Sequence, residues 1–224
     1  MSDEQRMQEM GEVLHRMMDE FFSIQCRYSA AMKEVQTKLE ILDDEFQMRH
    51  RRNPIHHIES RLKSIQSIME KLRRKQFSLS MASATEHLKD IAGIRVICSY
   101  VQDVYAVARL LTTQDDVKLV EMQDYIAHPK PNGYRSLHLI VEIPVFLQDG
   151  RIMVPVEVQL RTIAMDFWAS LEHSLRYKAA GNVPEDICDE LQAVGQDIAA
   201  LDLKMQSIHD RIDALIAQEK EPAN

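Results

Sequence analysis

Residues 91–101 form the stretch IAGIRVICSYV, whose many β-branched residues predict a strand. Downstream, short alternating segments predict three more strands, over 118–126, 136–145 and 152–160. The last two are joined by Asp149-Gly150, a dipeptide typical of hairpin turns. Helical periodicity over 102–114 and 162–179 adds helices to this region. The middle of the chain is therefore expected to fold as an α/β (α+β) domain.

Long helical segments flank this middle region. Apolar residues in steps of three and four predict a helix over 5–48, ended by Asn53-Pro54, and a second helix over about 55–75. The tail repeats apolar residues in heptads, at Ile187, Leu191, Val194, Ile198, Leu201, Met205, Ile208, Ile212 and Leu215. Such a stripe predicts a long helix that packs on another helix, although it could instead lie on its own domain. We expect a helical segment (1–54), a central domain (55–182) and an oligomerisation helix (183–224).

Composition limits the classes of function. The 224 residues are 45% hydrophobic and 28% charged, which suits one globular domain with helical extensions. The net charge of −8 argues against binding of duplex nucleic acid. No apolar run reaches the roughly 18 residues of a membrane helix, the first residues are polar, and three scattered cysteines form no C-x-x-C pair. We therefore expect a cytoplasmic protein without a membrane span.

A basic segment interrupts this acidic chain. Residues 49–75 contain 9 Lys or Arg and 2 Asp or Glu. On the expected second helix, one face would carry Lys63, Ser67, Lys71 and Arg74. That row could bind phosphates, or it could be a solvated lysine-rich face. No Walker A or G-x-G-x-x-G pattern occurs, so a bound nucleotide would not use a glycine-rich loop.

Two carboxylates fall at strand positions where they could hold a metal ion. In VPVEVQLR, Glu157 points away from the valines, and Asp90 directly precedes the strand over 91–101. Carboxylates from two strands are a common way to hold Mg²⁺ beside a phosphate. The alternatives are a turn cap for Asp90 and an ion pair with an arginine for Glu157. Farther along, Tyr134 at a loop edge could stack on a base, Lys130 could meet phosphates, and His138 could be a bystander.

Four motifs, in order, closely resemble the synthetase domain of RelA/SpoT proteins: RLKSIQSIMEKLRRK, LKDIAGIRVIC, DYIAHPKPNGYRSLHLIVEIPV and VPVEVQLRTIAMDFWASLEHSLRYK. The size and helical tail look like the small stand-alone alarmone synthetases, nearest to the RelQ type. This resemblance implies a mixed sheet of about five strands, related to nucleotidyltransferases. It also implies transfer of pyrophosphate from ATP to the ribose 3′-hydroxyl of GDP or GTP, which yields (p)ppGpp and AMP. No hydrolase domain accompanies the motifs, so we expect no product degradation.

The resemblance also implies roles for single residues. Those matching the ATP-phosphate positions are Arg61, Lys63, Ser67 and Lys71, and those matching the adenine sandwich are Arg74 and Arg95. Asp90 and Glu157 match the Mg²⁺ and catalytic acids, with Glu157 either a general base or only a metal ligand. The positions matching the acceptor nucleotide are Lys130, Tyr134, His138 and Gln159.

Two departures from these relatives concern regulation and acceptor choice. The relatives grip an activating alarmone partly with basic residues late in the first helical segment, where this chain has Glu40, Asp43, Asp44 and Glu45. Acidic residues there would repel a pentaphosphate, so we expect weak or absent activation by pppGpp. The relatives often have a basic residue where this chain has Gln123, which leaves the preference among GMP, GDP and GTP open.

The resemblance implies a homotetramer, a dimer of dimers, and leaves regulation by single-stranded RNA open. Two other functions stay possible. One is a toxic relative that pyrophosphorylates tRNA or adenine nucleotides, which the acidic composition and the Tyr134–His138 pair disfavour. The other is a nucleotide sensor without catalysis, which the presence of both Asp90 and Glu157 disfavours.

Overall fold

The computed structural model describes residues 3–178 and 183–220. Its centre is a five-stranded sheet with the order β1-β2-β5-β4-β3. The strands are β1 (Ile55–Leu62), β2 (Ala92–Cys98), β3 (Lys118–Asp124), β4 (Leu137–Leu147) and β5 (Gly150–Thr162). β2 and β5 run parallel and the other pairs antiparallel, which confirms a mixed sheet of five strands. The four strands predicted from sequence are all present.

The prediction of a helix over 55–75 is wrong in its first half. Residues Ile55–Leu62 form β1, which pairs antiparallel with β2, so that Ile58 lies opposite Val96. The helix α2 (Ile65–Arg74) begins after Ser64, whose hydroxyl accepts a hydrogen bond from the Ser67 amide. Ile58, Leu62 and Ile65 follow one another at helical spacing, which explains the error. Pairing with β2 overrides that local pattern.

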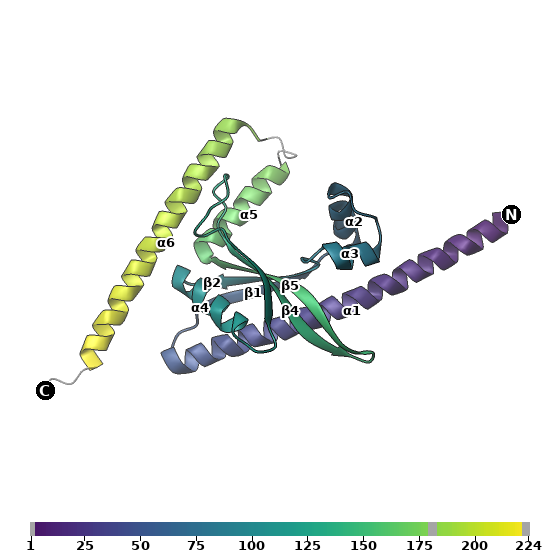
Figure 1. Cartoon of the computed structure of the whole chain (residues 1–224). Helices are drawn as coiled ribbons and strands as arrows, with labels where there is room; N and C mark the ends of the chain where they lie inside the picture. Colours follow the sequence, from purple (N-terminus) through teal and green to yellow (C-terminus); the bar gives the residue numbers. More distant parts are fainter. Residues whose placement is uncertain (1–2, 179–182, 221–224) are drawn as a thin grey trace.

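Helices cover one face of the four strands β1, β2, β5 and β4. α1 (Asp3–His50) runs along this face with α4 (Val101–Thr112) beside it, as Figure 1 shows. Val35 and Leu39 of α1 are fully buried in one core with Val96, Val156 and Val158 of the sheet. The opposite face is bordered by α2 and α3 (Met81–His87) at one side and by α5 (Ile163–Lys178) at the other. The space between them stays open for a site.

The C-terminal helix α6 (Glu185–Lys220) confirms the predicted long helix, but it packs on the domain with a different face from the heptad stripe. Asp202 accepts a 2.5 Å hydrogen bond from the Thr162 hydroxyl, and His209 stacks on Tyr100 at 4.3 Å. Seven stripe residues are 43–61% exposed: Ile187, Val194, Leu201, Met205, Ile208, Ile212 and Leu215. The apolar stripe is thus largely uncovered by the described chain. The predicted boundary at residue 182 lies outside the described residues.

Candidate active site

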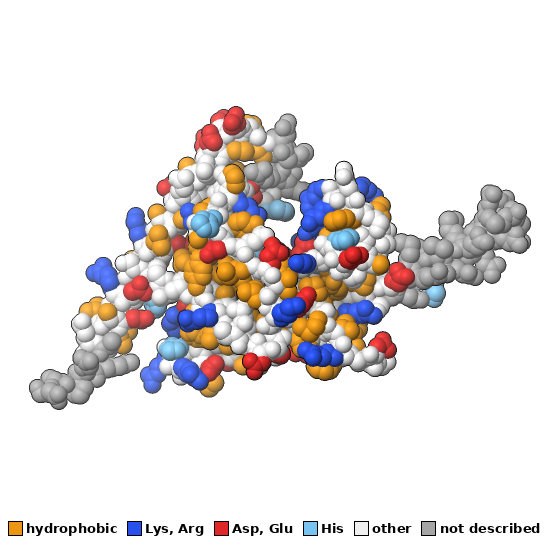
Figure 2. All heavy atoms as spheres, viewed as in Figure 1, with side chains coloured by type: hydrophobic (Ala, Val, Ile, Leu, Met, Phe, Trp, Pro, Cys, Tyr) orange, Lys and Arg blue, Asp and Glu red, His pale blue; other side chains and the backbone are white. Residues whose placement is uncertain are grey.

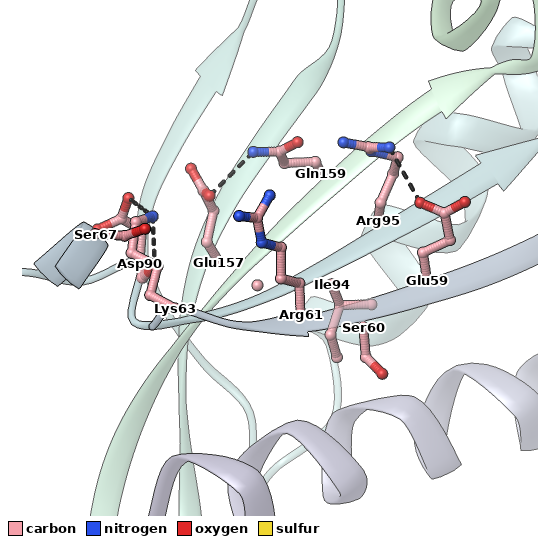
Figure 3. Close-up of a pocket in the computed structure, with 11 residues that line it drawn as sticks. Glu59, Ser60, Arg61, Lys63, Ser67, Asp90, Ile94, Arg95, Glu157 and Gln159 are labelled. Atoms are coloured by element: carbon pink, nitrogen blue, oxygen red, sulfur yellow. Dashed lines mark hydrogen bonds and ion pairs between the residues drawn. The ribbon is translucent and has the colours of Figure 1, made fainter. Parts of the chain in front are cut away.

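The open face of the sheet carries a block of polar side chains in register. Arg61 lies opposite Gly93, which lies opposite Glu157, and Arg95 lies opposite Gln159 in the next row. Because side chains alternate along strands, these residues share one face, and Figure 3 shows them pointing the same way. Gly93 has no side chain, so the space between Arg61 and Glu157 stays open.

Two cavities open on this face. The larger, of about 630 Å³, is lined by Glu59, Ser60, Arg61, Lys63, Ser67, Asp90, Gly93, Ile94, Arg95, Glu157 and Gln159. The smaller, of about 290 Å³, is lined by Lys71, Lys75, His87, Leu88, Lys89, Asp90, Glu121, Gln123, His138, Ile140 and Glu157. Asp90 and Glu157 line both cavities, so these two carboxylates stand where the cavities meet. Figure 2 shows lysine and arginine side chains gathered over α2.

Asp90 is held between two lysines. Lys63 donates a 2.6 Å hydrogen bond to Asp90 Oδ2, and Lys71 donates to the same oxygen. The Lys63 amide also donates to the carbonyl of Ile91 at 2.9 Å, which fixes the turn after β1 beside Asp90. Burial opposes ionisation of Asp90, but the two ammonium groups outweigh it, so its pKa is lowered. Two cations against one carboxylate leave a net positive site for phosphate.

Glu157 accepts a 3.0 Å hydrogen bond from Gln159 Nε2, and its Oε1 lies 3.5 Å from His138 Nδ1. Burial and the charge of Asp90 both disfavour ionisation of Glu157. The contacts with His138 and Gln159 outweigh them, so the pKa of Glu157 is lowered. Glu157 therefore carries its negative charge at neutral pH and is a weak proton acceptor.

The carboxylates fit a metal ion that arrives with a nucleotide. Within the described residues, no three His, Cys, Asp or Glu side chains gather as a metal-ligand set. Mg²⁺, however, commonly uses one or two protein carboxylates together with phosphate oxygens and water. Asp90 Oδ1 is buried and has no hydrogen-bond partner among the described residues, so this oxygen is available to coordinate a metal ion. Asp90 and Glu157 therefore fit Mg²⁺ shared with bound phosphates.

Hydrogen bonds connect Arg161, Tyr134 and His138, and a contact between His138 and Glu157 extends this series. Arg161 Nη2 donates to the Tyr134 hydroxyl at 2.5 Å, and that hydroxyl lies 2.7 Å from His138 Nε2. The Tyr134 hydroxyl oxygen accepts the bond from the guanidinium, which can only donate, and the hydroxyl also contacts Nε2 of His138. The other ring nitrogen of His138, Nδ1, faces Glu157. Arg161, which is 5% exposed, thus orients Glu157 through two intermediate side chains.

Cations also surround the ring of Tyr134. The ammonium group of Lys130 lies 4.8 Å from the Tyr134 ring centre and 4.3 Å from that of Tyr125. The guanidinium of Arg161 lies 5.0 Å from the Tyr134 ring. These cations contact the ring of Tyr134 through cation–π interactions, so a planar ligand that stacks on this ring must displace one of them.

The structure brings most of the predicted site residues together. Those at the larger cavity are Arg61, Lys63, Ser67, Asp90, Arg95, Glu157 and Gln159, and those at the smaller are Lys71, Asp90, His138 and Glu157. Tyr134 joins them through His138, and Lys130 through Tyr134. Arg74 is the exception, because it is exposed in the last turn of α2 and lines neither cavity. With β1 replacing the first half of the expected helix, the helical-face argument no longer applies to Lys63 and Arg74 together.

Sequence reasoning missed Arg161 and Asp166. Asp166 accepts a 3.0 Å hydrogen bond from Arg161 and lies 3.7 Å from Arg95, so it connects two cations of the site. Arg161 alternates with Glu157 and Gln159 on the same strand face, and this pattern was the available signal. Nothing local pointed to Asp166, since its role depends on how α5 folds back on the sheet.

Residues 60–182 match the sequence profile of the region found in RelA/SpoT proteins. The chain belongs to the RelA/SpoT family. Among relatives of this family, the Bacillus subtilis GTP pyrophosphokinase YwaC is 46% identical over 83% of this chain and 89% of its own length. B. subtilis GTP pyrophosphokinase YjbM is 38% identical over 83% of this chain and 86% of its own length.

Solved structures of RelA/SpoT proteins agree with this assignment. The crystal structure of small alarmone synthetase 2 from B. subtilis superposes with a TM-score of 0.78 and 43% identity, covering 86% of this chain and 99% of that one. Small alarmone synthetase 1 of the same organism, bound to its product pppGpp, gives a TM-score of 0.79 and 37% identity, covering 86% and 97%. The matched RelA/SpoT region contains every residue of the two cavities except Glu59.

Proposed function

We propose that this chain is a GTP pyrophosphokinase, which transfers pyrophosphate from ATP to the 3′-hydroxyl of GDP or GTP and releases AMP with (p)ppGpp. The observation that carries the proposal is the pair Asp90 and Glu157, placed where a cation-lined cavity meets a second one. Two nucleotides that must react end to end need such an arrangement. Relatives with this activity, similar over most of their length, support it.

The larger cavity would bind ATP. Attack at the β-phosphorus expels AMP, so the cations must hold the β- and γ-phosphates. Lys63 and Lys71 are placed for this, because phosphate can compete with Asp90 for both ammonium groups. Arg61 and Arg95 line the same cavity from neighbouring strands. We assign these two guanidiniums, in place of the Arg74–Arg95 pair, to stacking on adenine.

Asp90 and Glu157 would hold Mg²⁺, which when bound neutralises charge on the transferred phosphates. The lowered pKa of Glu157 makes it a weak base at neutral pH. We therefore assign Glu157 to holding the metal and orienting the acceptor hydroxyl, with His138 Nδ1 fixing its carboxylate. Phosphoryl transfer requires positioning and charge neutralisation more than strong proton abstraction.

The acceptor guanosine nucleotide would bind beside Tyr134, His138 and Gln159. A guanine that stacks on the Tyr134 ring would displace the ammonium group of Lys130, which rests 4.8 Å from that ring. Lys130 would then be free to reach the acceptor phosphates. Gln159 would meet the acceptor ribose, because it lies opposite His138 in the sheet and donates to Glu157, where the two cavities meet.

Surface features support a homotetramer. Four residues of α5 that repeat every fourth position are 48–59% exposed: Ile163, Phe167, Leu171 and Leu175. The exposed heptad stripe of α6 adds to this apolar area, and exposed apolar surface of this extent is typical of subunit contacts. Light scattering that shows a stable, fully active monomer would refute the tetramer. Among the described helices, none is long and apolar enough to cross a membrane. ATP and guanosine nucleotides as substrates would place the enzyme in the cytoplasm.

Activation by pppGpp is expected to be weak. A depression of about 250 Å³ between α1 and β1 is lined by Glu40, Asp43 and Asp44 together with two histidines. Asp43 accepts hydrogen bonds from Asn53 Nδ2 at 2.6 Å and from the Ile55 amide at 3.0 Å, so it secures the start of β1. These carboxylates disfavour a highly charged anion there.

A product assay tests the proposal. The purified chain is incubated with γ-labelled ATP, MgCl₂ and GDP, GTP or GMP, and products are separated by ion-exchange chromatography. We expect a labelled guanosine polyphosphate. The rates with GMP, GDP and GTP show which acceptor is preferred when Gln123 replaces the basic residue of the relatives. If no guanosine product forms while ATP still binds, the proposal fails, and tRNA and adenine nucleotides become the acceptors to test.

A further inference from the structure

We propose that Gly195 of α6 is a positioning residue for the acceptor nucleotide, because α6 presses directly on the loop that presents Tyr134. This inference rests on the acceptor role proposed for Tyr134. It assigns to the long C-terminal helix a task inside the active site, in addition to its exposed heptad stripe.

The contact is one of backbone against backbone. A Cβ atom on Gly195 would lie 3.1 Å from the carbonyl oxygen of Gly133 and 3.3 Å from its Cα. A Cβ on Gly133 would lie 3.3 Å from Gln192 Cα, and Gly133 has a φ of +89°, which favours glycine. Both partners therefore need to lack a side chain. Neither can gain one unless the loop and the helix move apart.

The loop transmits such a movement to the active site. The Gly133 amide donates to the carbonyl of Lys130 at 2.8 Å, and the Lys130 amide donates to the carbonyl of Tyr134 at 3.1 Å. The Tyr134 amide donates to Asn132 Oδ1 at 3.2 Å. This tight turn moves as a unit, and Tyr134 directly follows Gly133. A shift of Gly133 by a few tenths of an ångström therefore reaches the Tyr134 ring.

α6 also contacts the strand residue next to Arg161, whose guanidinium donates to the Tyr134 hydroxyl. Asp202, two helical turns beyond Gly195 and on the same side of α6, accepts a hydrogen bond from Thr162. Thr162 directly follows Arg161, the residue that donates to the Tyr134 hydroxyl at 2.5 Å. α6 thus contacts Gly133, which precedes Tyr134, and Thr162, which follows Arg161. Through these two contacts α6 sets the position of Tyr134 relative to Arg161.

A third contact, from Trp168 of α5, fixes the distance between α6 and the loop. Trp168 Nε1 donates a 3.0 Å hydrogen bond to the carbonyl of Leu191, and the same nitrogen would lie 3.4 Å from a Cβ on Gly195. Glycine is otherwise a poor residue for a helix interior. Its presence in α6 is explained by close approach to the loop, not by helix formation.

The test is the variant Gly195→Ala, with Gly11→Ala as the matched control. Both replace a glycine inside a helix, but a Cβ at Gly11 would meet nothing within 4 Å. Steady-state rates are measured with GDP varied at saturating ATP and with ATP varied at saturating GDP. We expect Gly195→Ala to raise the KM for GDP about fivefold with an unchanged KM for ATP, because small misplacements of a binding group weaken binding steeply. Gly11→Ala should change neither constant.

Tyr134→Ala separates this inference from the proposed function. If Tyr134→Ala raises the KM for GDP and Gly195→Ala does not, the role of Gly195 is overturned while the function stands. Equal rises in both KM values for Gly195→Ala would also overturn it, because they indicate general damage. If Gly195→Ala does not fold, Trp168→Phe removes the bond to Leu191 and keeps a smaller aromatic ring at this position, and the same selective rise is expected. Wild-type protein without any guanosine product would overturn the proposed function itself.

Discussion

The proposed active site has a donor half and an acceptor half, which are built in different ways. The donor half draws on Arg61, Lys63, Ser67 and Asp90, which lie close together in the sequence and meet through neighbouring strands and a short helix. The acceptor half depends on a loop, two strands and a distant helix, and its members are held by aromatic contacts and by the Arg161–Tyr134–His138 hydrogen bonds. The donor half thus combines residues 61–90 from neighbouring elements, whereas the acceptor half joins segments that lie far apart in the sequence.

Each half can therefore be disturbed at a different place in the molecule. In the donor half, the lysines already face a carboxylate, so ATP phosphates would replace one anion by another with little rearrangement. In the acceptor half, we propose that binding depends on the position of a loop that contacts α6. Changes near the donor should act on ATP and catalysis, whereas changes in α6 should act on the acceptor alone. The predictions below test this division.

The largest effect is expected at Glu157, which belongs to both halves. Glu157→Gln keeps the size of the side chain but removes the charge that would hold Mg²⁺, so we expect kcat to fall by about 10³-fold. The KM for ATP should change little, because the lysines and arginines remain. Synthesis rates and the thermal unfolding midpoint are measured together. Unchanged turnover in a folded variant would revive the sensor without catalysis.

Arg61 and Arg74 form a matched pair in the donor half. Arg61 lines the larger cavity and Arg74 does not, although both belong to the same basic segment. A desolvated cation–π contact contributes about 2 kcal/mol, so Arg61→Ala should raise the KM for ATP by about 30-fold. Arg74→Ala should leave that KM within about twofold. The reverse ranking would restore the helical-face prediction for Arg74.

In the acceptor half, Tyr134→Ala removes the stacking platform. Base stacking on an aromatic ring contributes about 1–3 kcal/mol, so the KM for GDP should rise by about tenfold or more with the KM for ATP unchanged. Tyr134→Phe keeps the ring and loses the bonds to Arg161 and His138, so its effect should be smaller. An effect of Tyr134→Ala on ATP alone would contradict the division between halves.

The Lys63–Asp90–Lys71 cluster also predicts a pH dependence of stability. The pKa of Asp90 is lowered in the folded protein, so its stabilising contribution is fully present above the unfolded pKa of about 3.9. It is lost as the pH falls through the lowered folded pKa. Wild type should therefore exceed Asp90→Asn in unfolding free energy by a constant amount at pH 5–8, and the difference should shrink below about pH 4. Denaturant titrations at each pH measure it, and a difference that grows on acidification would contradict the cluster.

The smallest effect concerns the acidic depression beside β1. Because Glu40, Asp43 and Asp44 line it, micromolar pppGpp should change the initial rate of synthesis by less than about twofold. Rates with and without added pppGpp decide this. An increase of several-fold would show that the acidic residues do not keep the alarmone away.

The residues that the sequence predicted also differ between the donor half and the acceptor half. Strand alternation predicted that Glu157 faces away from the valines, because period-two patterns determine which side a residue faces, and the strand register places it beside Gly93 on the open face. The role of Asp90 and Glu157 as metal ligands stays a prediction. The helix expected over 55–62 was wrong because an edge strand with mixed polarity can show helical spacing by chance. Pairing with β2, a tertiary event, decided the outcome.

The remaining features could not be predicted from local patterns. Arg161 showed its strand face but not its partner, since Tyr134 comes from a loop far away in the sequence. The approach of Gly133 to Gly195 joins two segments with no common periodicity. The heptad stripe predicted α6 correctly, yet the helix contacts its own domain through a different side, around Asp202 and His209.

The central claim is that pyrophosphate, not a single phosphate, passes from ATP to a guanosine nucleotide at Asp90 and Glu157. The most direct test uses α-labelled and γ-labelled ATP in parallel with GDP and Mg²⁺, and quantifies AMP, ADP and labelled guanosine products over time. We predict one AMP for each γ-labelled guanosine polyphosphate, with both lost together in Glu157→Gln. Accumulation of ADP, or of free phosphate and pyrophosphate without a guanosine product, would contradict the account.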